Sequence, residues 1–440
     1  MDWESELIDA GIDVNVLNAA ESGLPLNYAF EIKKTIATIL RKKALVVGLQ
    51  LPEGLQMFAL AIADILSTFT SCNCIVFGDV TYGACCIDDF AARALSCDLL
   101  VHYGHSCLVP VDQVSVPTLY VFVDIAFDLQ HFIDTLILNF PRPQYSSLAI
   151  CGTIQFVASI QSCRSRLVHL GYSVTVPQAR PLSPGELLGC TSPKLAENTD
   201  VLMSVSFFQK NYCFTPHDTT TYFPIRYLGD GRFHLESVLI HNPSLPSYRY
   251  DPYSKKFTRE DYDHEEMHSL RKHAIETAKS ALHWGIILGT LGRQGNPNVL
   301  GWLETSLKAQ GKQVTTILLS EIFPAKLDLF KDCDVFVQTS CPRLSIDWGY
   351  AFTKPLLSPY EAAVAMKRIE WQSTYPMDFY SREPLGEWTP GYWSKDAERL
   401  RLKEAKKRTT AAGTAAADTA GFKNALQTLA CGKKDCCSVK

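Results

Sequence analysis

The feature that most constrains the fold is an alternation of short apolar, β-like runs with longer segments of helical period, which continues through most of the 440 residues. Strands that alternate with helices indicate βαβ units, in which the strands pair in parallel. The expected strands are 44–51, 74–80, 99–104, 119–124, 147–154, 173–177, 227–230, 237–242, 284–292, 314–319 and 335–340, with helices at 54–67 and 299–309. The sequence therefore predicts an α/β fold built on parallel sheets.

These runs form three groups of similar plan, which indicates an internal pseudo-triplication. Three domains also suit a chain of this length, because one domain takes roughly 100 to 200 residues. We place the first βα domain at 24–142, the second at 143–270 and the third at 271–395. The joints are expected near 141–144 and within a charged helix at 259–279.

Two stretches do not fit this plan. Residues 204–226 interrupt a strand that begins at Val201, so we interpret them as an insertion in the second domain. Residues 396–440 combine a basic helix-like stretch at 399–408 with a run rich in Ala, Thr and Gly, a composition that builds little core. We expect this tail to be disordered and the basic stretch to be solvated rather than bound to nucleic acid.

Composition limits the class of protein. Hydrophobic residues make up 47% and charged residues 20% of the chain, which is typical of large buried cores. The formal net charge of -4 gives no sign of direct nucleic-acid binding. No apolar run reaches the roughly 18 residues that cross a bilayer, and the first residues, Met1 to Glu6, do not resemble a signal peptide. We therefore expect a cytoplasmic protein with no membrane partner.

Three cysteines stand in loops after β-like runs, one in each third of the chain. Cys85 follows the loop 78–84, Cys190 closes the loop 182–189, and Cys341 follows the run 335–337. Open α/β sheets bind ligands at the carboxyl ends of their strands, so these thiols can meet at one metal or iron-sulfur site. An odd, irregularly spaced set of fifteen cysteines suits ligands better than disulfides in a reducing compartment.

Each candidate also has an ordinary structural interpretation, because a lone cysteine or histidine is often a core residue. The glycine, alanine and proline neighbours of the three loop cysteines favour ligands. The other thiols and imidazoles considered are Cys86, Cys97, Cys107, His102, His105 and His234. Glycine-rich turns at 229–234 and 289–295 bring backbone N–H groups near a ligand, but neither has the spacing of a nucleotide-phosphate loop.

The tail contains Cys431, Cys436 and Cys437, which suggest a zinc site but lack the spaced pairs of a four-ligand site. A zinc-binding interaction module built on them would leave three domains without a role.

Several long motifs together resemble one enzyme family. They are YGACCIDD at 82–89, HYGHSC at 102–107, LSPGELLGCTSP at 182–193, the stretch 229–237 and CPRLSIDWG at 341–349. These motifs are similar to those of the catalytic subunits, termed subunit 1, of eukaryotic 2-(3-amino-3-carboxypropyl)histidine synthases. That family performs the first step of diphthamide biosynthesis, and the resemblance extends from about residue 24 to 379.

The resemblance implies three similar βα domains around a central four-iron four-sulfur (4Fe-4S) cluster held by Cys85, Cys190 and Cys341. Three thiolates leave one iron open, where S-adenosylmethionine, the cosubstrate, would bind and be cleaved on its aminocarboxypropyl side after one-electron reduction. The resulting radical would modify a histidine of elongation factor 2 and leave methylthioadenosine. The chain lacks the CxxxCxxC run of ordinary radical enzymes of this cofactor, in agreement with a noncanonical transferase.

The resemblance also suggests which residues line the cofactor site. We expect the backbone around Gly292, Gln294 and Gly295, and around Asp230 and Gly231, to lie there. No catalytic base is predicted, because the cluster carries the radical chemistry while the protein supplies orientation and exclusion of water.

The implied partners are a homologous subunit 2 in a heterodimer, a small iron-binding electron donor with a flavin reductase, and elongation factor 2 as the protein substrate. The segment 204–226 departs from the family, whose members pass directly from the strand after Asp200 into 229–231. It is either a surface loop or translated intron sequence. The alternative function is a noncatalytic, cluster-bearing scaffold subunit, but the presence of all three cysteines favours the catalytic one.

Overall fold

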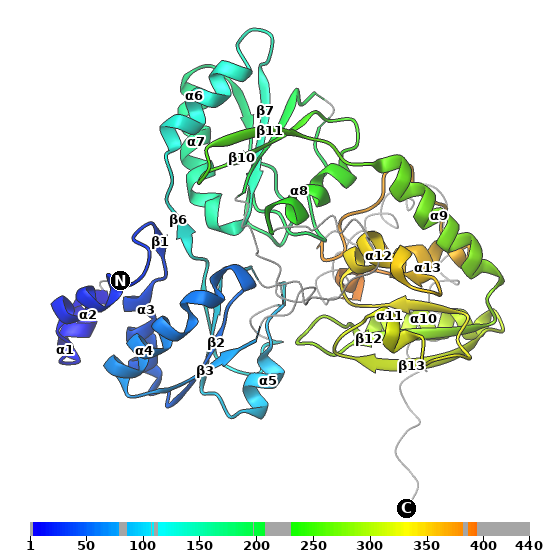
Figure 1. Ribbon diagram of the computed structural model, residues 1–440, viewed down its shortest axis with the longest axis horizontal. Helices are drawn as coiled ribbons and strands as arrows, with labels where there is room; N and C mark the ends of the chain where they lie inside the picture. Colours follow the sequence, from blue (N-terminus) through cyan, green and yellow to red (C-terminus); the bar gives the residue numbers. More distant parts are fainter. Residues whose placement is uncertain are drawn as a thin grey trace, which may run out of the picture. The chain divides into compact units, whose positions relative to one another are not determined.

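The computed structural model describes residues 3–78, 86–106, 108–109, 113–196, 198–206, 230–381 and 386–393 (Figure 1). For 230–232, and for Glu53, only the backbone is described. The chain divides into a large unit, Met1–Tyr392, and a second unit, Trp393–Lys440, nearly all of which lies outside the described residues. In the described part, no helix is long and apolar enough to cross a membrane.

The first of three sheets contains four parallel strands in the order β3-β2-β4-β5. The strands are β2 (Val46–Gln50), β3 (Asn73–Phe77), β4 (Leu99–Tyr103) and β5 (Thr118–Val121). The helices around it are α1 (Trp3–Asp9), α2 (Val14–Glu21), α3 (Ile32–Lys42), η1 (Glu53–Phe58), α4 (Ala59–Thr70) and α5 (Asp89–Ala94). A short antiparallel pair, β1 (Tyr28–Ala29) with β6 (Asp124–Ile125), joins the start of this region to the chain that leaves it.

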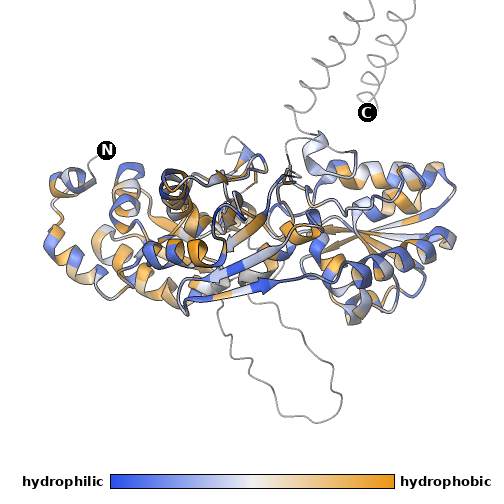
Figure 2. Cartoon of the chain, turned by 90° about the horizontal axis from the view of Figure 1, so that it is seen from above, coloured by the Kyte–Doolittle hydropathy of each residue, from blue (hydrophilic) through white to orange (hydrophobic). Residues whose placement is uncertain are grey.

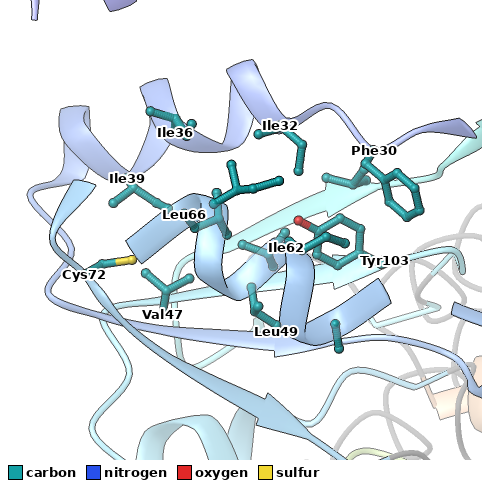
Figure 3. Packing of buried hydrophobic residues seen from close by; sticks show 14 of the residues in the cluster. Phe30, Ile32, Ile36, Ile39, Val47, Leu49, Ile62, Leu66, Cys72 and Tyr103 are labelled. Atoms are coloured by element: carbon teal, nitrogen blue, oxygen red, sulfur yellow. The ribbon is translucent and has the colours of Figure 1, made fainter. Parts of the chain in front are cut away.

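The core of the first sheet lies between its strands and helices α3 and α4. Val47 and Leu49 of β2 point toward Ile36 of α3 and Ile62 of α4 (Figure 3), and all four side chains are buried. The opposite face, which includes Leu100, packs against α5. Because alternate residues of a strand face opposite sides, a strand buried on both faces is apolar throughout.

The second sheet has five strands in the order β11-β10-β9-β7-β8, of which only the β10–β11 pair is antiparallel. The strands are β7 (Ser147–Gly152), β8 (Ser173–Thr175), β9 (Val201–Val205), β10 (Ser247–Asp251) and β11 (Lys256–Glu260). Its helices are α6 (Leu129–Asn139), η3 (Ile154–Phe156), α7 (Val157–His169) and α8 (Asp230–His241). Helices α6 and α7 cover one face, and α8 covers the other.

The third sheet has four parallel strands in the order β13-β12-β14-β15. The strands are β12 (His283–Gly289), β13 (Gln313–Leu319), β14 (Val335–Gln338) and β15 (Leu356–Leu357). Its helices are α9 (His264–Ser280), α10 (Pro297–Ala309), α11 (Pro324–Leu327), α12 (Pro342–Trp348), η4 (Gly349–Ala351), α13 (Pro359–Ala365) and η5 (Pro390–Trp393). Hydrophobic colouring marks many of the strands but not all, while the helices carry both hydrophobic and hydrophilic residues (Figure 2).

The three sheets repeat one topology. In each sheet, the strand that comes first in the sequence lies between the second and the third, and the strand that comes fourth pairs with the third. An aspartate directly before each third strand, Asp98, Asp200 or Asp334, accepts two backbone N–H hydrogen bonds from the start of the first strand. The donors are Leu45 and Val46, Ser146 and Ser147, and Leu282 and His283, at 2.8–2.9 Å. The predicted α/β class with parallel-sheet βα units is confirmed, whereas the exact domain boundaries stay a prediction.

The predicted strand 237–242 is wrong, because these residues belong almost entirely to helix α8. Leu235, Val238 and Leu239 are buried against the second sheet, and their spacing is that of one helix face. A short apolar run is compatible with a buried strand as well as with a helix, which explains the error.

The predicted helix at 259–279 begins too early, since 259–260 belong to β11 and α9 starts at His264. The predicted insertion also begins too early, because β9 continues to Val205, which pairs with Gly152 and Tyr250. Residues 207–226 of the insertion, and the predicted tail, lie outside the described residues.

Candidate metal centre

Cys190 and Cys341, which come from loops of different sheets, lie in one buried apolar cluster. Both cysteines are buried, with 2% and 6% of their surface exposed. The other members are Ala179, Leu182 and Leu188, with Leu108, Phe233 and Tyr380 packed against them. The structure therefore brings together two of the three thiols that the sequence singled out.

The turn that carries Cys341 is fixed by the last residue of β14. The Gln338 side chain donates to Cys341 O at 2.8 Å and to Ser345 Oγ at 3.0 Å, and it accepts from Ser340 N at 2.8 Å. Cys341 is the residue that precedes α12, and Pro342 begins that helix. Gln338 is fully buried, so these hydrogen bonds are shielded from water.

The loop that carries Cys190 is attached to the carboxyl end of β7. Gly152 N donates to Gly185 O at 2.8 Å, and Leu187 N donates to Gly152 O at 2.9 Å. Beyond the cysteine, Thr191 Oγ1 lies 3.8 Å from Cys190 Sγ and accepts from Tyr380 N at 3.2 Å. The cysteine is thus held between the second sheet and the segment that contains Tyr380.

Arg343 joins the two cysteine loops. Its guanidinium donates to Gly189 O at 3.2 Å, directly before Cys190, and to Phe233 O at 2.7 Å. It also pairs with Glu236 at 2.6 Å and Asp347 at 2.9 Å, and it lies 4.4 Å from the centre of the Phe233 ring. The side chain is fully buried, and the two carboxylates compensate its charge. Burial raises the pKa of Asp347 to about 6, even though Arg343 acts in the opposite direction.

The first predicted ligand, Cys85, lies outside the described residues, whereas the backbone that follows it, from Cys86 onward, is described. Gln50, the last residue of β2, donates to Cys86 O at 2.9 Å and accepts from Asp88 N at 3.0 Å. Cys86 itself is buried. The segment that follows Cys85 is therefore attached to the carboxyl end of the first strand of its sheet.

The glycine-rich loop of the third sheet packs against this same segment. Gly292 has a φ of +50°, and a Cβ there would lie only 2.8 Å from Ile87 O, so glycine permits both the conformation and the contact. Arg293 makes two hydrogen bonds to Asp89, at 2.8 and 2.7 Å, and lies 4.0 Å from the Phe90 ring centre. Burial raises the pKa of Asp89, but hydrogen bonds from Arg293 and Ser115 lower it to about 2.

Two polar atoms, beyond the carboxyl ends of β12 and β14, make no hydrogen bond to the part of the chain that the structure describes. Gln294 and Ser340 are buried, and among the described residues neither Gln294 Nε2 nor Ser340 Oγ makes a hydrogen bond. Tyr380, which packs on the cysteine cluster, donates to Gln294 O at 3.4 Å. Buried polar atoms are normally satisfied, so this pair indicates a place for a polar ligand beside the cysteines.

The remaining predicted residues are placed as follows. A Cβ on Gly295 would lie 2.4 Å from Gly289 O, so this glycine is needed for a close backbone approach. Asp230 and Gly231 begin helix α8, whose Phe233 packs on the cysteine cluster. Cys107 and the three tail cysteines lie outside the described residues.

Two of the three histidine candidates lie near each other. The rings of His105 and His234 are roughly parallel with centres 6.4 Å apart. His102 is buried in β4 instead, with its ring 5.5 Å from that of Tyr120. Cys97 is a buried residue of the first sheet's core.

Sequence reasoning did not single out Arg343, Gln338 or Gln50. A polar residue at the end of an apolar strand was the available signal for the two glutamines. For Arg343, the signal was a cation two positions after a candidate ligand.

Comparison with known proteins gives consistent matches. A family model of diphthamide synthesis proteins matches residues 51–376. Proteins named 2-(3-amino-3-carboxypropyl)histidine synthase subunit 1 are 56% identical over 381 residues in Dictyostelium discoideum (85% of this chain, 75% of that protein) and 54% identical over 383 residues in Gallus gallus (87% of each). The protein of that name from Homo sapiens is 54% identical over 375 residues, which is 85% of this chain and 80% of the human protein.

The fold is also that of a solved structure, Dph2 from Pyrococcus horikoshii with a 4Fe-4S cluster. The match covers 79% of this chain and 93% of that chain, with a TM-score of 0.62 and 22% identity.

Proposed function

The chain belongs to the family of diphthamide synthesis proteins, and from this premise we propose that it transfers the 3-amino-3-carboxypropyl group of S-adenosylmethionine to a histidine of translation elongation factor 2. This would make it the catalytic subunit of the first step of diphthamide biosynthesis and a noncanonical radical transferase. The observation that carries the proposal is the buried cluster in which loops of two sheets bring Cys190 and Cys341 together.

We propose that Cys85, Cys190 and Cys341 hold a 4Fe-4S cluster. The donor set fits, because thiolates are the usual ligands of such clusters and the two described thiols are shielded from water by apolar side chains. When bound, such a cluster would supply the electron with which S-adenosylmethionine is cleaved on the aminocarboxypropyl side of its sulfonium.

The residues of this chain would bind and orient the cosubstrate. Gln294 Nε2 and Ser340 Oγ make no hydrogen bond to the described residues, and this amide nitrogen and hydroxyl suit the carboxylate and amino groups of an amino-acid moiety. The backbone around Gly292 and Gly295 approaches closely enough to line the same place. Leu182 and Leu188 would exclude water from the reacting atoms. Asp230 and Gly231, at the start of α8, remain proposed contacts.

The proposed assembly is a heterodimer in the cytoplasm with a homologous subunit 2. The relatives' shared name, subunit 1, supports a partner subunit. A small iron-binding protein with a flavin reductase would supply the electron, and elongation factor 2 would be the protein substrate.

The experiment is anaerobic reconstitution of the chain together with subunit 2, followed by dithionite reduction in the presence of S-adenosylmethionine and elongation factor 2. We expect methylthioadenosine and a mass increase of elongation factor 2. Deoxyadenosine in place of methylthioadenosine would contradict the cleavage mode. Full turnover by a complex in which only this chain carries Cys341→Ala would show that the chain is the scaffold.

A further inference from the structure

A carboxylate that the proposed chemistry has not yet used is buried four residues before Cys190. Glu186 is fully buried where its loop pairs with Gly152 at the end of β7. Its Oε2 atom accepts from Ser183 N at 2.9 Å, and no direct hydrogen bond reaches Oε1 from the residues that the structure describes. A buried carboxylate with spare acceptor capacity is costly for stability and is frequently functional.

The groups beside Glu186 come from a different sheet and from α8. The side chain of Ser106, which follows β4, hydrogen-bonds to the carboxylate, and His234 on α8 interacts with it electrostatically. Both interactions lower the pKa of Glu186. The ring of His105 lies parallel to that of His234 at 6.4 Å. We call Glu186, His234, His105 and Ser106 the carboxylate–imidazole array.

The position of this array is fixed relative to the cysteines. Gln155 donates to Gly104 O at 2.7 Å, which holds the end of β4 against the second sheet. Phe233, the neighbour of His234, packs on the Cys190 and Cys341 cluster, and its carbonyl accepts from Arg343. The array therefore borders the candidate metal centre.

Exposure changes along the array. His105 and Ser106 are partly exposed, while His234 and Glu186 are buried. Burial raises the pKa of Glu186, and Ser106, Ser183 and His234 partly oppose the effect. Among the described residues, His234 is the titratable side chain that interacts electrostatically with Glu186. The ring of His105 stacks on that of His234 and is more exposed to solvent.

We propose that the carboxylate–imidazole array accepts the proton that the target histidine releases from its imidazole carbon. This inference rests on the proposed function. A C–C bond forms between the aminocarboxypropyl group and the imidazole carbon, and the C–H bond at that carbon breaks. The proton passes to the array, and the electron left behind returns to the oxidised iron-sulfur cluster, so the transfer is redox-neutral. General bases work best when their pKa lies near the operating pH.

The test compares Glu186→Gln and His234→Asn with the wild-type chain, each in complex with subunit 2. Glutamine keeps an oxygen that can accept from Ser183 N but cannot take up a proton. We expect methylthioadenosine to form at a near-normal rate, while modified elongation factor 2 per methylthioadenosine falls by about 100-fold, the lower range for loss of a general base. Glu265→Gln, on the exposed side of α9, is the matched control and should keep the wild-type ratio.

A second measurement needs neither cluster nor turnover. In the metal-free protein, one component of the infrared carbonyl absorption of protonated carboxyl groups should be present in the wild type and absent in Glu186→Gln, while other buried carboxyl groups such as Asp347 contribute to the absorption of both. The component that Glu186→Gln lacks should titrate above about pH 4.3, the ordinary value for glutamate.

The outcomes separate the two claims. A wild-type complex that forms no methylthioadenosine contradicts the proposed function. A wild-type complex that works, with an unchanged product ratio in both variants, overturns the proton-acceptor role alone. If Glu186→Gln loses its iron, the yield of modified elongation factor 2 per methylthioadenosine in His234→Asn tests the proton-acceptor role instead. A wild-type yield in His234→Asn would then overturn that role and leave Glu186 as a residue that supports the cysteine loop.

Discussion

Replacing Arg343 by methionine should separate the two cysteine loops and destabilise the protein. Methionine keeps an unbranched apolar stem but leaves Glu236 and Asp347 without their cation in a site where Arg343 is fully buried. Breaking a buried ion pair in this way costs about 3–5 kcal/mol. Asp347 can relieve part of this cost by binding a proton, because burial already raises its pKa to about 6. We therefore expect a loss near the lower limit, about 3 kcal/mol at pH 7, which is roughly a 100-fold change in the unfolding equilibrium.

The assay is urea unfolding of the metal-free protein, together with iron content after reconstitution. Arg343→Met should unfold at lower urea and retain less iron, since Gly189 O loses the donor that links the Cys190 loop to the Cys341 loop. Arg259→Met is the control, because Arg259 is exposed and lies 3.5 Å from an exposed Asp261. Its effect should stay within about 0.5 kcal/mol. Equal stability and iron content of Arg343→Met and wild type would refute the argument.

Two further predictions concern the repeated aspartates and the glycines. Asp98→Asn and Asp334→Asn should each lower the free energy of unfolding by about 1 kcal/mol at pH 7, because each carboxylate accepts two backbone N–H bonds. These bonds hold the pKa of both groups below the ordinary value, so the stabilisation is present above about pH 4 and is lost as the pH falls through the folded-state pKa. Urea unfolding at pH 7 and pH 3 checks this. An equal difference in unfolding free energy between each variant and the wild type at both pH values would contradict it. Gly295→Ala should lower iron retention, because its Cβ would lie 2.4 Å from Gly289 O. Gly301→Ala is the matched control, because Gly301 lies within α10 and a Cβ there would meet no other atom. It should stabilise the protein by about 0.5–1 kcal/mol. Thermal unfolding and iron content measure both, and equal iron retention in the two glycine variants would contradict the close approach.

The sheets were predictable where strands are apolar on both faces. Strands such as β2 and β12 lie between helices, so their sequences are continuous apolar runs. The hairpin of β10 and β11 was missed because both strands are rich in polar and charged residues and contain no continuous apolar run. Helix α8 was mistaken for a strand because a short apolar run fits either element.

The cysteine loops were predictable from their position after strands, because the carboxyl ends of parallel strands gather ligands. What holds the loops together was not predictable in the same way. Arg343 reaches Gly189, which is 154 positions earlier in the chain, and Arg293 reaches Asp89, which is 204 positions earlier. Such pairs depend on how separate sheets meet, and local sequence pattern carries no record of that.

The most direct test of the account is the iron and sulfide content of four single variants after anaerobic reconstitution. Cys85→Ala, Cys190→Ala and Cys341→Ala should each lose most of the cluster, because no backbone group replaces a thiolate. Cys86→Ala should keep about four irons per chain, as expected for one 4Fe-4S cluster, because buried Cys86 is predicted to be a core residue. A full cluster in Cys190→Ala or Cys341→Ala would contradict the three-ligand site, and loss in Cys86→Ala with retention in Cys85→Ala would move the first ligand by one residue.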